Sequence, residues 1–312
     1  MIVRGGLVAL CCAALLAACS TYRDDLGAAA IAQDQAAGPI LIETRMALED
    51  GHSFPVEILL PARPGSYPLI VFSSGNFASP DRYARLLKPI AEAGYVIASP
   101  VHLDAEVLAL DPPADPLTIW QRRNDELAYL AGPAEPLQAA LARHRVALEP
   151  GQIGVMGHSY GALIAQTAAG ANAWQMGGAQ PSRKIAGADV LVAFSPPGPV
   201  PGAILAEGWS SIALPSFTQS GTADILPGFV DDWRDHITSY EQTAPGDRWL
   251  WYGEGIDHYF GGIYGREKPV TPDIEAKFAH ALAATIAFLD IHLKDLPDRA
   301  PAAPAGVTLA KD

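Results

Sequence analysis

The sequence is poor in cysteine, and this scarcity limits the chemistry that the chain can carry. Its three cysteines all fall within the first 19 of 312 residues, at positions 11, 12 and 19. The rest of the chain therefore has no cysteine pair for a disulfide between distant segments and no cysteine ligand for a metal. The sequence also lacks a dinucleotide fingerprint, a P-loop and a metal-ligand pattern. We therefore expect neither a cofactor nor a metal.

Basic residues are scarce as well. Lysine and arginine number 21 against 34 aspartates and glutamates, which gives a net charge of -13. Nucleic-acid binding needs a basic face, so we do not expect a nucleic-acid partner. Charged residues make up only 18% of the chain and hydrophobic ones 49%. A chain of this composition can bury a large hydrophobic core, and we do not expect it to be disordered.

The apolar run at the N-terminus, Leu7 to Ala18, is too short for a comfortable membrane span. With Arg4 before it, the run is typical of a signal peptide over residues 1–18. It ends in Leu-Ala-Ala-Cys, which resembles the bacterial lipobox. We therefore predict that Cys19 is lipidated and anchors the protein in a bacterial envelope, and Ser20 favours the outer membrane. An ordinary signal peptide with an incidental cysteine is the alternative.

Between the termini, short apolar runs alternate with helical stretches. Residues 19–38 predict a linker, 39–296 a catalytic domain, and the proline-containing residues 297–312 a flexible tail. Near-continuous apolar strands are typical of a sheet covered on both faces. The pattern therefore predicts an α/β fold with a mainly parallel central sheet and helices on both faces. The predicted strands are 69–72, 95–98, 153–156, 190–194, 215–218 and 249–251, with 54–60 as an antiparallel edge strand.

Residues 157–161 match G-x-S-x-G around Ser159. The five letters alone are weak evidence, but a buried strand ends at Met156 and an alanine-rich helix begins at Tyr160. This strand-turn-helix setting is the one that exposes a nucleophilic serine. We therefore predict Ser159 as the nucleophile, and a purely structural turn is the alternative. We expect the neighbouring His158 to pack into the fold.

A serine that attacks an ester creates an oxyanion, which two backbone N–H groups should face. The residue after the nucleophile, Tyr160, should supply one of them. The loop that follows the strand 69–72 should supply the other, because Gly75 lets the backbone turn and Asn76 then offers its N–H. Phe77 is the alternative donor, and a simple turn is the alternative for the whole loop.

The base should follow the serine in the chain. His258 lies in a glycine-rich loop just after the last predicted strand, where it can reach Ser159, so we predict it as the base. His236 lies in a charged run that predicts a solvated helix. His280 and His292 lie on the C-terminal helix.

The acid should lie between the serine and the base. Asp224 follows the strand 215–218, at the carboxyl edge where such folds place catalytic groups. Its role would be to fix the imidazole tautomer and stabilise the imidazolium. Asp231, Asp232 and Glu254 are the alternatives, although none of them directly ends a strand.

With these residues in place, the chain resembles the predicted dienelactone hydrolases. These are bacterial relatives of platelet-activating-factor acetylhydrolase within the α/β-hydrolase superfamily. The likeness covers about residues 39–293 and rests on the segments 157–161, 221–224, 257–258 and 120–125. It implies an α/β-hydrolase fold, and an Arg and an Asp near residue 120 that support it. Arg122 and Asp125 are spaced for such a pair. True dienelactone hydrolases use cysteine where this chain has Ser159.

The motifs together predict a carboxylic-ester hydrolase that cleaves a small-molecule ester through an acyl-enzyme intermediate. An acyltransferase with the same triad and a noncatalytic envelope lipoprotein on a hydrolase scaffold are the alternatives. The apolar segment 103–120 is short and broken by prolines. We therefore expect short or medium acyl chains.

Overall fold

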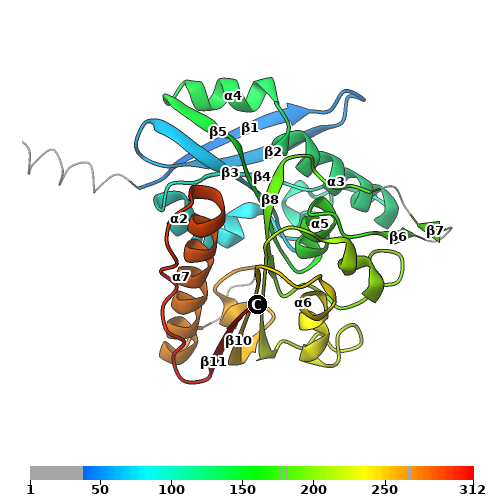
Figure 1. Cartoon of the computed structure of the whole chain (residues 1–312). Coiled ribbons are helices and arrows are strands. Elements are labelled where there is room, and N and C mark those ends of the chain that lie inside the picture. Colours follow the sequence, from blue (N-terminus) through cyan, green and yellow to red (C-terminus); the bar gives the residue numbers. More distant parts are fainter. Residues whose placement is uncertain (1–37, 176–177, 180–181, 266–268) are drawn as a thin grey trace, which may run out of the picture. The chain divides into compact units, whose positions relative to one another are not determined.

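Nine strands form one sheet in the computed structural model, and Figure 1 shows it running through the centre of the molecule. The strands are β1 (Ile40–Ala47), β2 (Ser53–Leu60), β3 (Gly65–Ser73), β4 (Val96–Pro100), β5 (Val146–His158), β8 (Ala188–Phe194), β9 (Ser216–Ala223), β10 (Arg248–Asp257) and β11 (Val307–Lys311). Their order is β1-β2-β4-β3-β5-β8-β9-β10-β11. The six strands from β4 to β10 pair in parallel, whereas β1, β2 and β11 join antiparallel.

The structure describes residues 38–175, 178–179, 182–265 and 269–312. The predicted signal peptide, Cys19 and all but the last residue of the predicted linker lie outside these ranges. Residues Pro39–Asp312 form a single unit. Among the described residues, no helix combines the length and the apolar character needed to cross a membrane.

Helices cover both faces of the sheet, as predicted. The α-helices are α2 (Ala84–Glu92), α3 (Pro116–Ala131), α4 (Glu135–Ala142), α5 (Tyr160–Ala168), α6 (Thr238–Gln242) and α7 (Pro272–Lys294). One core packs α3 and α5 against the sheet, and a second core packs α2 and α7 on the other face (Figure 1). The mainly parallel α/β architecture is confirmed.

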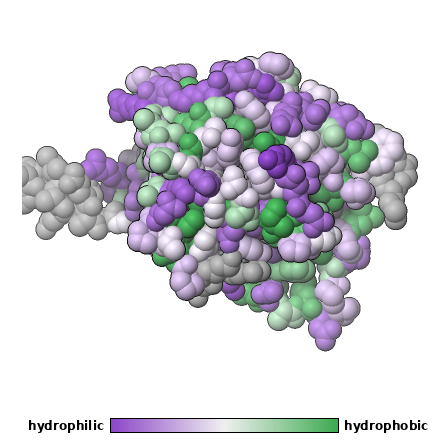
Figure 2. Space-filling view, turned by 90° about the horizontal axis from the view of Figure 1, so that it is seen from below, coloured by the Kyte–Doolittle hydropathy of each residue, from purple (hydrophilic) through white to green (hydrophobic). Residues whose placement is uncertain are grey.

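Short elements fill the connections. These are the 3-10 helices η1 (Pro80–Tyr83), η2 (Glu106–Leu108), η3 (Ala206–Ser211), η4 (Trp233–Ile237) and η5 (Phe260–Gly262), and a small hairpin of β6 (Trp174–Gln175) and β7 (Gly178–Ala179). On the face that Figure 2 shows, hydrophobic side chains lie in groups between hydrophilic ones.

Two predictions about the sheet edges are wrong. The strand at residues 54–60 is antiparallel but does not form the edge, because β1 pairs with it from Ile40 to Ala47 and takes the outer position. The tail 297–312 is not flexible throughout, because β11 pairs with β10. Residues 307–310 read Val-Thr-Leu-Ala, a short alternating run of strand-forming residues. The three prolines upstream in this segment hid that signal.

Candidate active site

Ser159 lies on a sharp turn between the end of β5 and the start of α5. Its backbone has φ 55° and ψ -122°, and a non-glycine residue adopts a positive φ only at a cost of about 1–3 kcal/mol. The two flanking glycines make the turn possible. A Cβ at Gly157 would lie 2.2 Å from the carbonyl oxygen of Gly161, and one at Gly161 would lie 2.0 Å from that of Ser73. The G-x-S-x-G motif is therefore a packing requirement of this turn.

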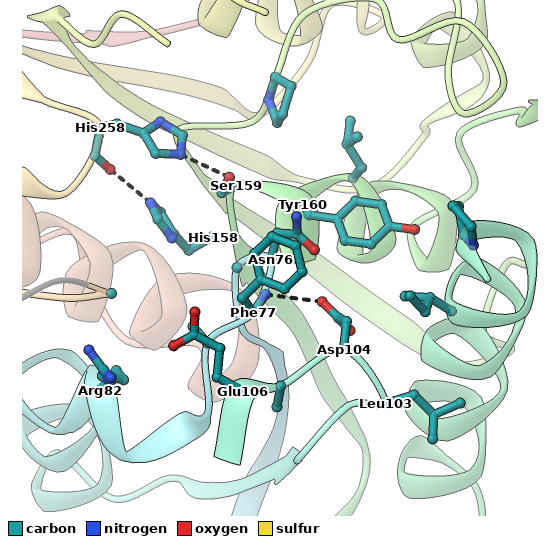
Figure 3. Close-up of a pocket in the computed structure, with 18 of the residues that line it drawn as sticks. Asn76, Phe77, Arg82, Leu103, Asp104, Glu106, His158, Ser159, Tyr160 and His258 are labelled. Atoms are coloured by element: carbon teal, nitrogen blue, oxygen red, sulfur yellow. Dashed lines mark hydrogen bonds between the residues drawn. The ribbon is translucent and has the colours of Figure 1, made fainter. Parts of the chain in front are cut away.

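The structure brings the three predicted triad residues together. The Nε2 atom of His258 lies 2.8 Å from Oγ of Ser159, and its Nδ1 atom lies 2.8 Å from Oδ1 of Asp224 (Figure 3 shows the first contact). A carboxylate only accepts hydrogen bonds, so Nδ1 carries the proton that it donates to Asp224. The Nε2 atom is then free to accept the proton of the Ser159 hydroxyl.

Asp224 is fully buried just after the end of β9. Burial alone would raise its pKa, but the hydrogen bond from His258 and the close imidazole of His236 hold the pKa of Asp224 well below its ordinary range. The hydroxyl of Ser220 donates a further hydrogen bond of 2.8 Å to Oδ2. The three alternative acids, Asp231, Asp232 and Glu254, are all exposed. Asp224 is therefore the carboxylate that the base contacts.

His236 is not solvated, contrary to the prediction from its charged neighbours. It is fully buried, and its Nε2 atom lies 2.8 Å from Oδ1 of Asp224. The exposed Asp232 and Asp235 that precede it make the run charged, but they do not determine the direction of the His236 side chain. The apolar Ile237, which follows His236 and is also buried, was the nearest signal in the sequence.

The loop after β3 leaves one of its N–H groups available. The N–H of Gly75 donates to the hydroxyl of Tyr83 at 2.9 Å, and that of Phe77 donates to Oδ2 of Asp104 at 3.1 Å. Within the described residues, the N–H of Asn76 has no hydrogen-bond partner. This pattern favours Asn76 over Phe77 as the predicted oxyanion donor, and Figure 3 shows Asn76 close to Ser159 and Tyr160.

Tyr160 is the first residue of α5, a position whose N–H has no partner within the helix. Its N–H group is therefore available for the predicted role as the second donor. Burial raises the pKa of the Tyr160 phenol to about 12, so this side chain stays neutral beside the nucleophile.

A buried arginine holds residues 74–77, which we call the oxyanion loop after the predicted role of Asn76. The Arg123 guanidinium donates to the carbonyl oxygens of Ser74 at 2.6 Å and Gly75 at 3.1 Å. It also donates to both carboxylate oxygens of Asp104, at 2.8 and 2.6 Å. Asp104 in turn accepts from the N–H of Phe77. The loop that carries Asn76 is thus fixed at Ser74, Gly75 and Phe77.

The predicted pair of Arg122 and Asp125 does not form. Arg122 pairs with Asp50, and Asp125 pairs with Arg183. Arg123 is instead the inward-facing arginine of α3. It lies on the buried stripe of this helix, three residues after Trp120, four before Leu127 and seven before Leu130. The helical spacing of that stripe was the available signal.

His158 packs into the fold, as expected. The Tyr83 hydroxyl lies 2.9 Å from its Nδ1 atom, and its Nε2 atom lies 2.8 Å from the carbonyl oxygen of His258. Because that carbonyl accepts, Nε2 is the donor and Nδ1 accepts from Tyr83. A continuous chain of hydrogen bonds thus runs from Gly75 through Tyr83 and His158 to the backbone of His258.

A second hydrogen-bonded serine, histidine and carboxyl group lies beneath the oxyanion loop. Oγ of Ser73 is 2.8 Å from Nε2 of His102, whose Nδ1 atom is 2.6 Å from Oε2 of Glu126. The Nε2 atom of His52 is 2.7 Å from Oε1 of the same carboxyl group. Ser73, His102 and Glu126 are all fully buried. The sequence offered no motif for this cluster.

Desolvation decides the protonation of that second cluster. It raises the pKa of Glu126 to about 8 and lowers the pKa values of His102 and His52. Each group is then neutral at pH 7, and the protons can be arranged so that every hydrogen bond has one donor. His102 donates to Glu126, Glu126 donates to His52, and the Ser73 hydroxyl donates to His102.

Three possible metal ligands, from Asp224, His236 and His258, lie within 4.8 Å of one another. Both imidazole nitrogens lie 2.8 Å from the same carboxylate oxygen. An ion among these atoms would break the contact between His258 and Asp224, on which the predicted proton transfer depends. The cluster therefore fits a hydrogen-bonded site better than a metal centre.

A cleft of about 940 Å³ opens over Ser159. Phe77 and Phe229 stand at it with 56% and 60% of their surface exposed. Figure 3 shows Ser159, His258 and Asn76 among the residues that line it. Its apolar lining includes Leu103, Leu110, Ile119, Leu163, Val200 and Leu226. Ser159 thus faces a space that could hold an organic molecule with apolar parts.

No protein-family model matches the sequence, and no curated protein matches it significantly. Solved structures do resemble it. A ferulic acid esterase from Streptomyces cinnamoneus aligns with a TM-score of 0.60 at 16% identity, over 87% of this chain and 95% of its own. The chain has the α/β-hydrolase fold.

Two further structures agree on this α/β-hydrolase fold. A thermophilic carboxylesterase cloned from a metagenomic library aligns with a TM-score of 0.57 at 14% identity, over 84% of this chain and 92% of its own. A dienelactone hydrolase from Anabaena variabilis aligns with a TM-score of 0.53 at 15% identity, over 82% of this chain and 100% of its own. Each likeness concerns the fold.

Proposed function

We propose that this protein is a serine hydrolase that cleaves carboxylic esters through an acyl-enzyme intermediate. The observation that carries the proposal is the hydrogen-bonded chain from Ser159 through His258 to Asp224 at the cleft. Nucleophile, base and orienting acid are within hydrogen-bond reach of one another, which is the arrangement that activates a serine. The solved neighbours named as esterases are consistent with the same chemistry.

The first half-reaction forms the acyl-enzyme. His258 takes the Ser159 proton at Nε2 while Oγ attacks the ester carbonyl, and the N–H groups of Asn76 and Tyr160 stabilise the oxyanion. The intermediate then collapses, and His258 returns the proton to the departing alcohol. The ionised Asp224 stabilises the imidazolium that exists between these two steps.

The second half-reaction releases the acid. Water enters the place of the alcohol, His258 takes one of its protons, and the resulting hydroxide attacks the acyl carbonyl. Collapse of this second intermediate returns the proton to Oγ of Ser159 and frees a carboxylic acid. The protein adds no oxidant, reductant or metal to this balance.

We further propose that the acyl chain is short or medium in length. The support is the segment over the cleft, where η2 is a single short turn and Pro113 and Pro116 interrupt the chain. Such a segment can shade the nucleophile but does not build a long apolar trench. The measurement is kcat/KM for nitrophenyl butyrate against palmitate below micelle formation, and a preference for palmitate would contradict the proposal.

The function is tested by labelling the full chain with a fluorophosphonate and by nitrophenyl ester hydrolysis. We expect a single covalent label on Ser159 and release of nitrophenol. The variant Ser159→Ala should lose both signals, whereas Ser210→Ala, at an exposed serine of η3, should keep them. Hydrolysis that survives in Ser159→Ala would refute the proposal.

We also propose that the protein is lipid-anchored in a bacterial envelope through Cys19. The support is the lipobox-like sequence that ends at this residue, together with the short apolar run before it. The variant Cys19→Ser should move the protein from the membrane fraction to the soluble one, because the lipid supplies the membrane affinity. Membrane association that persists in this variant would contradict the anchor.

A further inference from the structure

His236 is a buried histidine to which the proposed reaction assigns no step. Its Nδ1 atom lies 2.9 Å from the carbonyl oxygen of Pro196, and its Nε2 atom lies 2.8 Å from Oδ1 of Asp224. Its ring centroid is 5.5 Å from that of His258. The side chain therefore contacts Asp224, and its ring lies beside that of His258 at a tilt of 39°.

The partners of His236 define where its protons are. The carbonyl oxygen of Pro196 can only accept, so Nδ1 carries a proton and donates it. Asp224 is ionised and also only accepts. A proton on Nε2 would make this 2.8 Å contact attractive, whereas without it two electron-rich atoms would lie against each other.

The contact between His236 and Asp224 is close but is not an aligned hydrogen bond. Nε2 of His236 lies 2.8 Å from Oδ1, yet it lacks a partner in regular hydrogen-bond geometry among the described residues. The hydrogen bond to the same Oδ1 atom comes from Nδ1 of His258. Any effect of His236 on Asp224 would therefore act through charge rather than through a directional bond.

The charges near this pair are few. The titratable groups that face His236 are Asp224 after β9, His258 after β10 and His158 at the end of β5, while Tyr264 faces Asp224. Burial and neighbouring positive charge lower the pKa of His158, and burial raises that of Tyr264, so both are neutral near pH 7. Asp224 is then the ionised group in direct contact with His258.

We propose that His236 carries a proton on each ring nitrogen and is a positioning residue, which neutralises Asp224 and so keeps His258 available as a base at mildly acidic pH. An unopposed carboxylate beside an imidazole favours the protonated ring, typically by 1–3 pH units. The positive charge on His236 offsets that effect. The inference rests on the proposed function, because it assigns His258 the role of base.

The first test is the pH dependence of fluorophosphonate labelling of Ser159, which needs the base but no particular ester. In His236→Gln, an amide replaces the charged ring with a neutral donor. We expect the midpoint of the acidic limb to move up by about one pH unit or more, with the rate at pH 9 within about fivefold of the original.

A uniform fall in rate with an unmoved midpoint would overturn the proposal, since that is the result of a purely structural role. The matched control is His280→Gln. His280 is also buried and also contacts two partners, Nε1 of Trp251 and the carbonyl oxygen of Pro301, but it lies on α7 away from the triad. The midpoint of the acidic limb in His280→Gln should stay at the pH found for the unaltered protein.

The second test needs no variant. In the ¹⁵N spectrum of the histidine-labelled protein at pH 8, we expect one of the eight histidines to show two protonated ring nitrogens. An unprotonated ring nitrogen in all eight would overturn the proposal even if Ser159 is labelled. Absence of labelling would instead refute the proposed function, so the two failures are distinguishable.

Discussion

Two serine-histidine-carboxyl chains lie in this molecule, and they differ in charge and access rather than in connectivity. In both, a serine Oγ is 2.8 Å from a histidine Nε2 whose Nδ1 atom faces a buried carboxyl group. The hydrogen bond from His258 and the close imidazole of His236 keep Asp224 ionised, whereas desolvation raises the pKa of Glu126 to about 8. A neutral acid cannot stabilise an imidazolium, so only the chain at Ser159 is arranged to activate its serine.

Access separates the two serines further. Ser159 lines the cleft, while Ser73 is fully buried and accepts a hydrogen bond of 3.3 Å from Arg123. The second chain therefore belongs to the support of the oxyanion loop, because Arg123 also holds the carbonyl groups of Ser74 and Gly75. Hydrogen-bond connectivity alone does not make a catalytic triad.

The largest expected contrast is between the two serines. Ser159→Ala should lower kcat by on the order of 10⁵–10⁶, because triad members act as a unit. Ser73→Ala should keep the fluorophosphonate label and lose no more than about tenfold in kcat. Labelling stoichiometry and ester hydrolysis of both purified variants check this, and a label on Ser73 in Ser159→Ala would break the distinction.

The two carboxyl groups should differ almost as much. Asp224→Asn should lower kcat by about 10³–10⁴, because an amide no longer fixes the imidazole tautomer. Glu126→Gln replaces an already neutral group, so we expect kcat to change by less than about fivefold. Steady-state kinetics at pH 8 give both values. Similar losses in the two variants would mean that Glu126 takes part in turnover.

Arg123 connects the second chain to the site, and its loss should have an intermediate effect. Lysine keeps the charge but cannot reproduce the planar fork that holds Asp104 and two carbonyl groups. We expect Arg123→Lys to lower kcat by about 10–100-fold through a displaced oxyanion donor, with KM little changed. The exposed Arg143→Lys is the control, and a loss confined to KM would contradict this role.

The smallest expected effect concerns the pH dependence of the free energy of unfolding. The pKa of Glu126 is about 8 in the folded protein against an ordinary value of 4.5, so the folded state holds this proton more tightly. The contribution of Glu126 to the free energy of unfolding is then fully present below about pH 4.5. It falls as the pH rises towards 8, by up to about 1.4 kcal/mol per pH unit.

Glu126→Gln should remove this dependence. We expect its Tm to fall less than that of the unaltered protein between pH 5 and pH 8, as measured by thermal unfolding at several pH values. Glu135→Gln, at an exposed position of α4, is the control and should follow the unaltered protein. Parallel curves for Glu126→Gln and the unaltered chain would show that Glu126 is ionised.

The parts of the site that sequence could predict are those with a local pattern. Ser159 follows from a strand, a tight turn and a helix that are contiguous in the chain, and Asp224 and His258 follow from their places after two strands. The structure brings these three residues together. They meet because the parallel strands that precede them end at the same edge of the sheet.

The parts that sequence could not predict depend on contacts between distant segments. Arg123 and Arg122 are adjacent in an amphipathic helix, and only a shift of one position decides which of them is buried. His236 follows several exposed acids in the chain, yet the carboxylate that it contacts is Asp224. Ser73, His102 and Glu126 come from three separate elements, so no spacing in the sequence links them.

The strand β11 has a consequence for how the chain can be shortened. Residues 307–311 pair with residues 249–253, and the N–H of Glu254 donates to the carbonyl oxygen of Gly306 at 2.7 Å. A chain that ends at residue 296 would leave these groups of β10 without partners. An exposed strand of this kind pairs readily with other copies. Such a truncated protein should aggregate, even though it keeps every residue of the candidate site.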